Sequence, residues 1–158
     1  AEGPGAGCFA AVPDGHDIRV IAQSVHGRPD GLAPTIGLRG PAFNTAAGRA
    51  ILSQMPDEAL DGWLDSLQPK GATDFTVTDK RALKSEIMHV RKEGFAITAQ
   101  EWRRGYHAAA VPLRRYDGAT IAALCVAVWV EDSSVGSAAE SHLPALTQEA
   151  EELRPQLP

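Results

Sequence analysis

The stretch GLRGPAFNTAAGRAIL, residues 37–52, opens the part of this chain that decides its fold. It is followed by KRALKSEIMHVRKEGFAI at 80–97 and by YHAAAVPLRRYDGATIAALCVAVWV at 106–130. The order is a Gly/Ala-rich helix start, two amphipathic helices, a strand, a hairpin and a long apolar strand. This order predicts an α+β domain in which helices pack against an antiparallel sheet.

Four helices are expected, at about residues 44–55, 56–67, 79–93 and 138–153. Asn44 and Thr45 are both good N-caps for the first helix, and Pro56 suits the first turn of the second. Gly94 suits the left-handed C-cap position after the third helix. Each of the last three helices has one apolar face, of the kind that packs against a sheet.

Five strands are expected, at about residues 8–12, 17–25, 95–98, 106–115 and 119–131. Asp117-Gly118 is a strong turn signal between the last two strands, which should therefore form a hairpin. Residues 26–43 are rich in glycine and proline, and are interpreted as a long loop with some extended structure. Such a loop in a compact domain is often functional.

The composition indicates an ordinary globular domain. The net charge is 15 − 20 = −5 with Lys and Arg scattered, which disfavours binding to phosphate backbones by this chain. No apolar leader and no run of about 18 apolar residues is present, so neither export nor a membrane is expected and the location is expected to be cytoplasmic. The two cysteines, Cys8 and Cys125, lie in different contexts and predict no disulfide. Residues 1–7 are interpreted as an interdomain linker or chain edge, and residues 8–155 as one domain.

No catalytic machinery is visible in the sequence. The five histidines are never spaced for a metal site, and no cysteine accompanies them. The GPGAG segment at residues 3–7 lacks the preceding strand and following helix that a dinucleotide loop needs. The serines lack the setting of a nucleophile elbow. We therefore expect no enzymatic activity, no metal and no cofactor.

Asn44-Thr45-Ala46-Ala47-Gly48 forms a helix start made of small residues. Free backbone N–H groups and the positive end of a helix can bind an anion, and small side chains let a carboxylate come close. The alternative is plain packing of the helix against the sheet, for which alanine and glycine are equally useful.

One face of the two late strands also presents small residues. Ala108 lies on the first strand, and Cys125 and Ala127 share a face of the second, while bulkier residues point to the other face. A row of small residues leaves space, and space rimmed by a few polar groups is what a ligand cavity requires. The alternative is that a helix packs closely there, or that native side chains such as Trp102 or Phe43 fill the space.

These features and their spacing resemble the effector-binding domain of IclR-family transcriptional regulators. The motif that carries most of the resemblance is Gly48-Arg49-Ala50-Ile51-Leu52, preceded by Pro41 and followed by Met55-Pro56-Asp57-Glu58. Further motifs at 83–96 and 101–112 follow in the same order, and the resemblance spans about residues 8–153.

The resemblance implies a GAF-like fold, with an antiparallel sheet of about six strands flanked by helices. It also implies a winged helix-turn-helix domain, not part of this chain, through which the longer protein binds operator DNA. The chain is expected to associate with itself, as a dimer or tetramer. The runner-up is a GAF-type signalling module that binds another small molecule such as a nucleotide. A basic helix-turn-helix segment upstream would separate the two.

Carried over position by position, the resemblance places the effector pocket at Ala46, Ala47, Thr98, Ala108, Cys125 and Ala127. Members that bind small 2-oxo acids present polar groups at the last four of these positions. Replacing polar groups by methyls removes the hydrogen bonds that such acids need. The expected effector is therefore an organic acid with an apolar or aromatic body, and glyoxylate- or pyruvate-like effectors are disfavoured.

The carboxylate of this effector is expected at the start of the first helix. Thr98, together with His107 or Asn44, is expected to supply a hydrogen bond. The candidates for pairing with the negative charge are Arg39, Arg49 and Arg103. Arg49 has the weaker claim, because the arginine of its motif could brace the fold instead.

Overall fold

The computed structural model describes residues 6–23, 36–129 and 139–157. Within these ranges six strands form: β1 (Ala6–Asp14), β2 (Asp17–Gln23), β3 (Arg39–Pro41), β4 (Ala96–Ala99), β5 (Tyr106–Arg114) and β6 (Thr120–Trp129). The same ranges contain four α-helices: α1 (Ala46–Leu52), α2 (Asp57–Ser66), α3 (Lys80–Glu93) and α4 (Leu143–Leu153). Two single-turn 3-10 helices, η1 (Glu140–His142) and η2 (Arg154–Gln156), flank α4.

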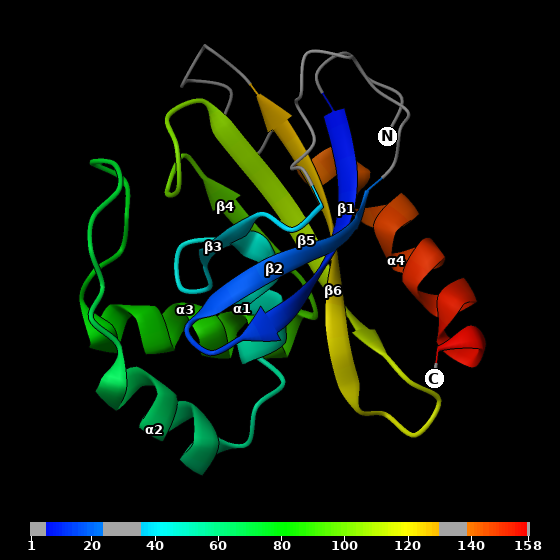
Figure 1. Cartoon of the computed structure of the whole chain (residues 1–158), viewed down its shortest axis with the longest axis horizontal. Helices are drawn as coiled ribbons and strands as arrows, with labels where there is room; N and C mark the ends of the chain where they lie inside the picture. The colour runs from blue at the N-terminus through cyan, green and yellow to red at the C-terminus, as the bar shows by residue number, and fades with distance from the viewer. Residues whose placement is uncertain (1–5, 24–35, 130–138, 158) are drawn as a thin grey trace.

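The strands form one antiparallel sheet in the order β3-β2-β1-β6-β5-β4 (Figure 1). The long strand β6 lies in the middle, between β1 and β5, as suits its length and apolar character. The expected turn between β5 and β6 is also present, with Gly118 at a φ of +91°. Residues 24, 25, 130 and 131, expected at strand ends, lie outside the described residues.

Strand β3 was not predicted, because it lies within the segment interpreted as a loop. It pairs with β2 at the edge of the sheet, with Gly40 opposite Ile18. Three residues are too few to show the alternation by which a strand is recognised, and Pro41 is tolerated because an edge strand has one unpaired side. Residues 26–35 of the expected loop lie outside the described residues.

The helices cover the two faces of the sheet unequally (Figure 1). Helices α1, α2 and α3 lie on one face, whereas α4 lies on the other and packs on β5 and β6. Two buried clusters result: the larger contains Leu60, Leu83 and Ile87 from the helices, and the smaller contains Val126 and Leu146. Among the described residues, no helix has the length and apolar character needed to cross a bilayer.

Helix α1 begins as expected, with the Thr45 hydroxyl accepting a hydrogen bond from the Gly48 N–H at 3.2 Å. It ends at Leu52, three residues earlier than expected. Gly48 faces the backbone of Ala42 so closely that a Cβ at this position would overlap it. This contact holds α1 against the segment that follows β3, and it explains the glycine of the motif.

The ends of α3 match the sequence prediction, whereas the start of α4 does not. Asp79 caps the N-terminus of α3, and Gly94 follows its C-terminus with a φ of +87°. Helix α4 begins at Leu143, because residues 139–142 form a turn and the single-turn helix η1. Residue 138, the expected start, lies outside the described residues.

Candidate functional site

A small apolar cavity, here called the inner pocket, lies between the start of α1 and the sheet. It is lined by Phe9, Ile18, Val20, Leu38, Gly40, Thr45, Ala46, Ala47, Trp102, Tyr106, Ala108 and Cys125. Its free volume is about 20 Å³. A cavity of that size has room for about one water molecule. The inner pocket is therefore almost filled by its own side chains in this structure.

The strand register explains which small residues meet at the inner pocket. Ala108 of β5 is paired with Thr98 of β4 on one side and with Ala127 of β6 on the other. Directly paired residues of an antiparallel sheet share a face, so these three point toward α1. Cys125 lies on the same face of β6, opposite Phe9 of β1. Ala108 and Cys125 line the pocket, whereas Thr98 and Ala127 lie in the same row without lining it.

His107 lies on the other face of the sheet, because side chains alternate along β5. It is buried, at 1 % exposure, and neither ring nitrogen has a hydrogen-bond partner among the described residues. Burial lowers the pKa of its imidazole. The structure therefore does not bring His107 together with Ala108 and Cys125.

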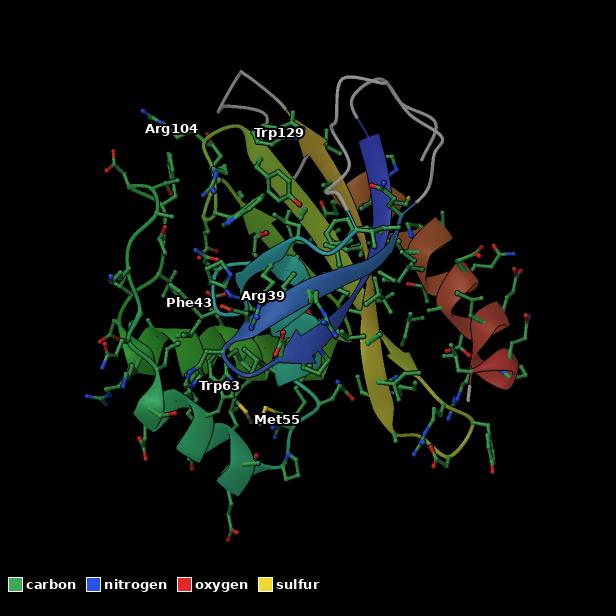
Figure 2. The ribbon with its side chains drawn as sticks, viewed as in Figure 1. Arg39, Phe43, Met55, Trp63, Arg104 and Trp129 are labelled. Atoms are coloured by element: carbon green, nitrogen blue, oxygen red, sulfur yellow. The ribbon has the colours of Figure 1, made fainter. Side chains whose placement is uncertain are left out.

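A second hollow, here called the outer cleft, lies beside the inner pocket and has a volume of about 620 Å³. It is lined by His16, Asp17, Leu38, Arg39, Pro41, Phe43, Asn44, Ser66, Leu67, Gln68, Lys70, Gly71, Ala72, Trp102 and Arg103. Arg39 and Phe43, labelled in Figure 2, come from β3 and from the segment before α1. The start of α1 marks the boundary, with Asn44 in the outer cleft and Ala46 in the inner pocket.

Leu38 and Trp102 line both spaces and form the wall between them. The indole of Trp102 packs edge-on against Tyr106, with ring centroids 4.9 Å apart. The guanidinium of Arg103 lies 4.4 Å from the centre of the indole ring. Aromatic and cation–π contacts of this kind hold Trp102 in place without a directional bond.

The three candidate cations differ in their partners. Arg49 is buried, and its guanidinium donates to both carboxylate oxygens of Glu101, at 2.8 and 2.6 Å, and to the Phe43 carbonyl at 2.9 Å. Arg39 pairs with Asp14 at 3.0 Å and lies 3.6 Å from Asp17. Arg103 forms no ion pair with any other described residue.

Glu101 was not identified as a site residue from the sequence. Its carboxylate also accepts a hydrogen bond from the Val77 N–H at 3.2 Å, so it joins α1 to the segment before α3 and to the turn after β4. The only signal available was its place in a family motif, because its arginine partner lies 52 positions away. The same separation in sequence explains why the ion pair of Arg49 with Glu101 was not predicted.

Asn44 is 1 % exposed, and its side-chain oxygen has no hydrogen-bond partner among the described residues. A buried acceptor without a partner is costly, and such groups are often completed by a ligand or a water. Asn44 therefore offers an acceptor for an N–H or O–H group at the boundary between the two spaces.

The inner pocket is neutral as well as apolar. Burial strongly raises the pKa of the Cys125 thiol, an effect reinforced by Cys8 and partly offset by the Ala47 N–H. Burial also raises the pKa of Tyr106 well above its ordinary value. Neither group is ionised near neutral pH, so neither can act there as a nucleophile or base. Within the described ranges, no group of three metal-ligating side chains comes together.

Comparison with known proteins identifies relatives of the chain. The family described as bacterial transcriptional regulator IclR C-terminal matches residues 8–153. The Pca regulon regulatory protein of Pseudomonas putida is 32 % identical over 148 residues, which cover 93 % of this chain and 51 % of the relative. The p-hydroxybenzoate hydroxylase transcriptional activator of Acinetobacter baylyi is 29 % identical over 148 residues, covering 90 % of this chain and 55 % of the relative. The chain thus spans about half the length of these relatives.

A solved structure shares the fold. It is the inducer-binding domain of the PobR transcription factor from Acinetobacter, a double mutant in complex with 3-hydroxybenzoic acid. The two chains superpose with a TM-score of 0.83 at 27 % sequence identity, covering 96 % of this chain and 89 % of the other. The match agrees with the expectations of an α+β fold and of a regulatory rather than an enzymatic domain.

Proposed function

Since the chain belongs to the IclR C-terminal family of bacterial transcriptional regulators, we propose that its inner pocket binds an organic acid with an apolar or aromatic body. The observation that carries the proposal is the character of the lining. Ala46, Ala47, Ala108 and Cys125 offer methyl groups and a neutral thiol, and no charged side chain is found among the described residues that line the inner pocket. An apolar surface of this kind favours an apolar group of the effector.

The acid group is assigned to the boundary between the inner pocket and the outer cleft, at the start of α1. Arg39 and Arg103 line the cleft on that side, and Asn44 supplies an acceptor for a hydroxyl group of the effector. Arg49 is assigned a structural role instead, since Glu101 and the Phe43 carbonyl occupy its guanidinium. Thr98 and Ala127 would contact only an effector that extends further along the sheet, and His107 is assigned no contact.

Two relatives support an aromatic effector. One is described as the transcriptional activator of p-hydroxybenzoate hydroxylase, and the related PobR domain holds 3-hydroxybenzoic acid. A hydroxybenzoate combines an aromatic body, a carboxylate and a hydroxyl, which are the three groups that the lining could receive. Small 2-oxo acids remain disfavoured, because the pocket presents methyl groups where they need donors.

The longer protein is proposed to carry a winged helix-turn-helix domain that binds operator DNA in the bacterial cytoplasm. This chain would contribute the effector site and contacts between subunits. The alternative, a GAF-type module that binds a nucleotide, requires cationic or polar groups for phosphate and base. The described lining of the inner pocket contains no cationic side chain for a phosphate, so the organic acid is preferred.

The experiment is thermal unfolding of the chain with a panel of 3-hydroxybenzoate, 4-hydroxybenzoate, benzoate, pyruvate, glyoxylate and cyclic AMP. A ligand present at 100 times its Kd adds about 2.7 kcal/mol to the free energy of unfolding and raises the Tm. We expect an aromatic acid to raise the Tm while pyruvate, glyoxylate and cyclic AMP do not. Stabilisation by pyruvate or cyclic AMP alone would refute the proposed effector class.

A further inference from the structure

The inner pocket is too small in this structure for the effector that its lining favours. Its free volume is about 20 Å³, whereas the neighbouring outer cleft has about 620 Å³. An aromatic ring cannot enter a space that holds about one water molecule. Side chains of the wall between the two spaces must therefore move before such a body is bound.

Of the residues that the structure describes, only Leu38 and Trp102 line both spaces, and Trp102 is the larger of the two. The indole lies over β3, where a Cβ at Gly40 would be 3.8 Å from its ring nitrogen. No hydrogen bond joins that nitrogen to any other described residue. A movement of the indole toward the outer cleft therefore breaks no hydrogen bond to the described part of the chain.

The backbone on both sides of Trp102 is firmly held. On one side Gln100 has a φ of +60°, which is rare for residues other than glycine, and its N–H donates to the Tyr106 carbonyl at 2.8 Å. Glu101 is fixed by Arg49 of α1. On the other side the Gly105 N–H donates to the Gln100 side chain at 3.0 Å. Only residues 102–104 lie between these two fixed points. The Trp102 side chain can therefore move while the backbone on either side of it keeps its position.

Arg103 is coupled to the position of Trp102. Its guanidinium lies 4.4 Å from the indole centre, and it pairs with no carboxylate among the described residues, whereas Arg39 already pairs with Asp14. A movement that separates the indole from the guanidinium would free Arg103 on the side that faces the outer cleft. A carboxylate would then replace the indole as its partner.

We infer that Trp102 is a gate that occupies the effector volume of the inner pocket, and that Arg103 exchanges the Trp102 indole for the effector carboxylate when the gate opens. This inference rests on the proposed function, and it adds which side chain must be displaced and which arginine pairs with the acid. Through Glu101 and Arg49, the base of the gate is joined to α1.

The first test removes the gate. Trp102→Ala should leave an apolar cavity that binds free indole, as engineered apolar cavities bind aromatic molecules. Indole should raise the Tm of Trp102→Ala and leave that of the parent chain unchanged, while 3-hydroxybenzoate should associate faster with the variant. If indole does not stabilise Trp102→Ala, or if association with the variant is no faster, the gate is refuted.

The second test compares Arg103→Gln with Arg104→Gln. Arg104 is an exposed neighbour that points outward at the edge of the molecule, away from Arg39 and Phe43 (Figure 2). Because one charge-assisted hydrogen bond is lost, Arg103→Gln should bind 3-hydroxybenzoate about tenfold more weakly, or weaker still. Arg104→Gln should bind like the parent, and neutral 3-hydroxybenzyl alcohol should not distinguish the variants. Equal affinities for the acid in Arg103→Gln and Arg104→Gln would overturn the role of Arg103.

The outcomes separate this inference from the proposed function. If indole stabilises Trp102→Ala but no aromatic acid stabilises any form, Trp102 does fill a cavity and the proposed effector class is wrong. If Trp102→Ala does not fold, a chain with Trp63→Phe and Trp129→Phe leaves Trp102 as its only tryptophan. Its emission should shift to longer wavelength when 3-hydroxybenzoate binds, and binding without a shift would refute the gate.

Discussion

At the scale of single residues, the Arg49–Glu101 pair links the helix start of the site to the turn that carries Trp102. Both side chains are buried, and the guanidinium meets the carboxylate in a two-pronged contact. Such a pair is costly to break, because the partner left behind is an uncompensated buried charge. The arginine of the family motif therefore braces the fold in this chain.

Glu101→Gln should lower the free energy of unfolding by about 3 kcal/mol or more, the usual cost of breaking a buried pair. Urea unfolding followed by circular dichroism measures this difference. Lys84→Gln is the control, since Lys84 pairs with Asp61 on the surface and its loss should leave stability nearly unchanged. A Glu101→Gln variant as stable as Lys84→Gln would show that the pair is not structural.

Cys125 predicts a loss of stability at alkaline pH. Burial raises the pKa of its thiol above the ordinary value of 9.0, so the unfolded chain releases this proton at a lower pH than the folded chain. The stabilising effect is complete below pH 9.0 and falls as the pH rises, by up to about 1.4 kcal/mol per pH unit.

The measurement is urea unfolding at neutral and alkaline pH, under reducing conditions, for the parent chain and Cys125→Ala. The variant should lose less stability between the two pH values than the parent. Cys8→Ala is the control. Burial raises the pKa of the Cys8 thiol too, but this thiol is only half-buried. Its removal should therefore reduce the alkaline loss of stability less than Cys125→Ala does. Equal losses in the parent and in Cys125→Ala would contradict this account of the thiol.

At the scale of elements, the position of α1 depends on the absence of a side chain at Gly48. A Cβ there would overlap the Ala42 backbone, which cannot move without displacing the start of the helix. Gly48→Ala should therefore cost about 3 kcal/mol or more, at the upper end of overpacking. Gly62→Ala, on exposed α2 with open space around it, should instead stabilise by about 0.5–1 kcal/mol. Thermal unfolding of Gly48→Ala and Gly62→Ala measures both effects. A Gly48→Ala variant as stable as the parent chain would contradict the packing described.

The strands and helices with a clear pattern were predictable from the sequence, and the short or non-local features were not. Asp79 and Gly94 carry local signals, which gave the ends of α3. Strand β3 has three residues and takes its conformation from pairing with β2, so no local pattern marks it. Helix α1 ends early in tight turns, in which the N–H groups of Gln54 and Met55 donate to the Ile51 and Leu52 carbonyls.

The candidate site was predictable only where it follows strand alternation. The small residues of β5 and β6 share a face by periodicity, and this placed Ala108 and Cys125 on the face that lines the inner pocket. The same alternation places His107 on the opposite face. The pairing of Arg49 with Glu101 depends on contacts between distant segments, which a single sequence does not reveal. Trp102 was named from the sequence only as one of two side chains that could fill the space, and it does line the inner pocket.

At the scale of the whole molecule, both the family and the edges of the sheet favour self-association. Within the described ranges the sheet has two edges, β3 and β4, each paired on one side only. Unpaired strand edges are surfaces on which a second copy can pair. We predict that the chain forms a reversible dimer or tetramer as its concentration rises through the micromolar range. Sedimentation velocity measures this, and a single monomeric species at high micromolar concentration would contradict it.

The central claim is that the inner pocket binds an aromatic acid, and a matched pair of variants tests it most directly. Ala108→Val adds two methyl groups to the lining of the inner pocket, whereas Ala109→Val adds the same groups on the face covered by α4. Both variants should lose stability, by about 1–3 kcal/mol, because both sites are buried.

The measurement is calorimetric titration of the parent chain, Ala108→Val and Ala109→Val with 3-hydroxybenzoate and 4-hydroxybenzoate. We predict that the parent and Ala109→Val bind at least one of these acids with similar affinity, and that Ala108→Val binds it much more weakly or not at all. Binding that is equal in the two variants, or absent from the parent chain, would contradict the account.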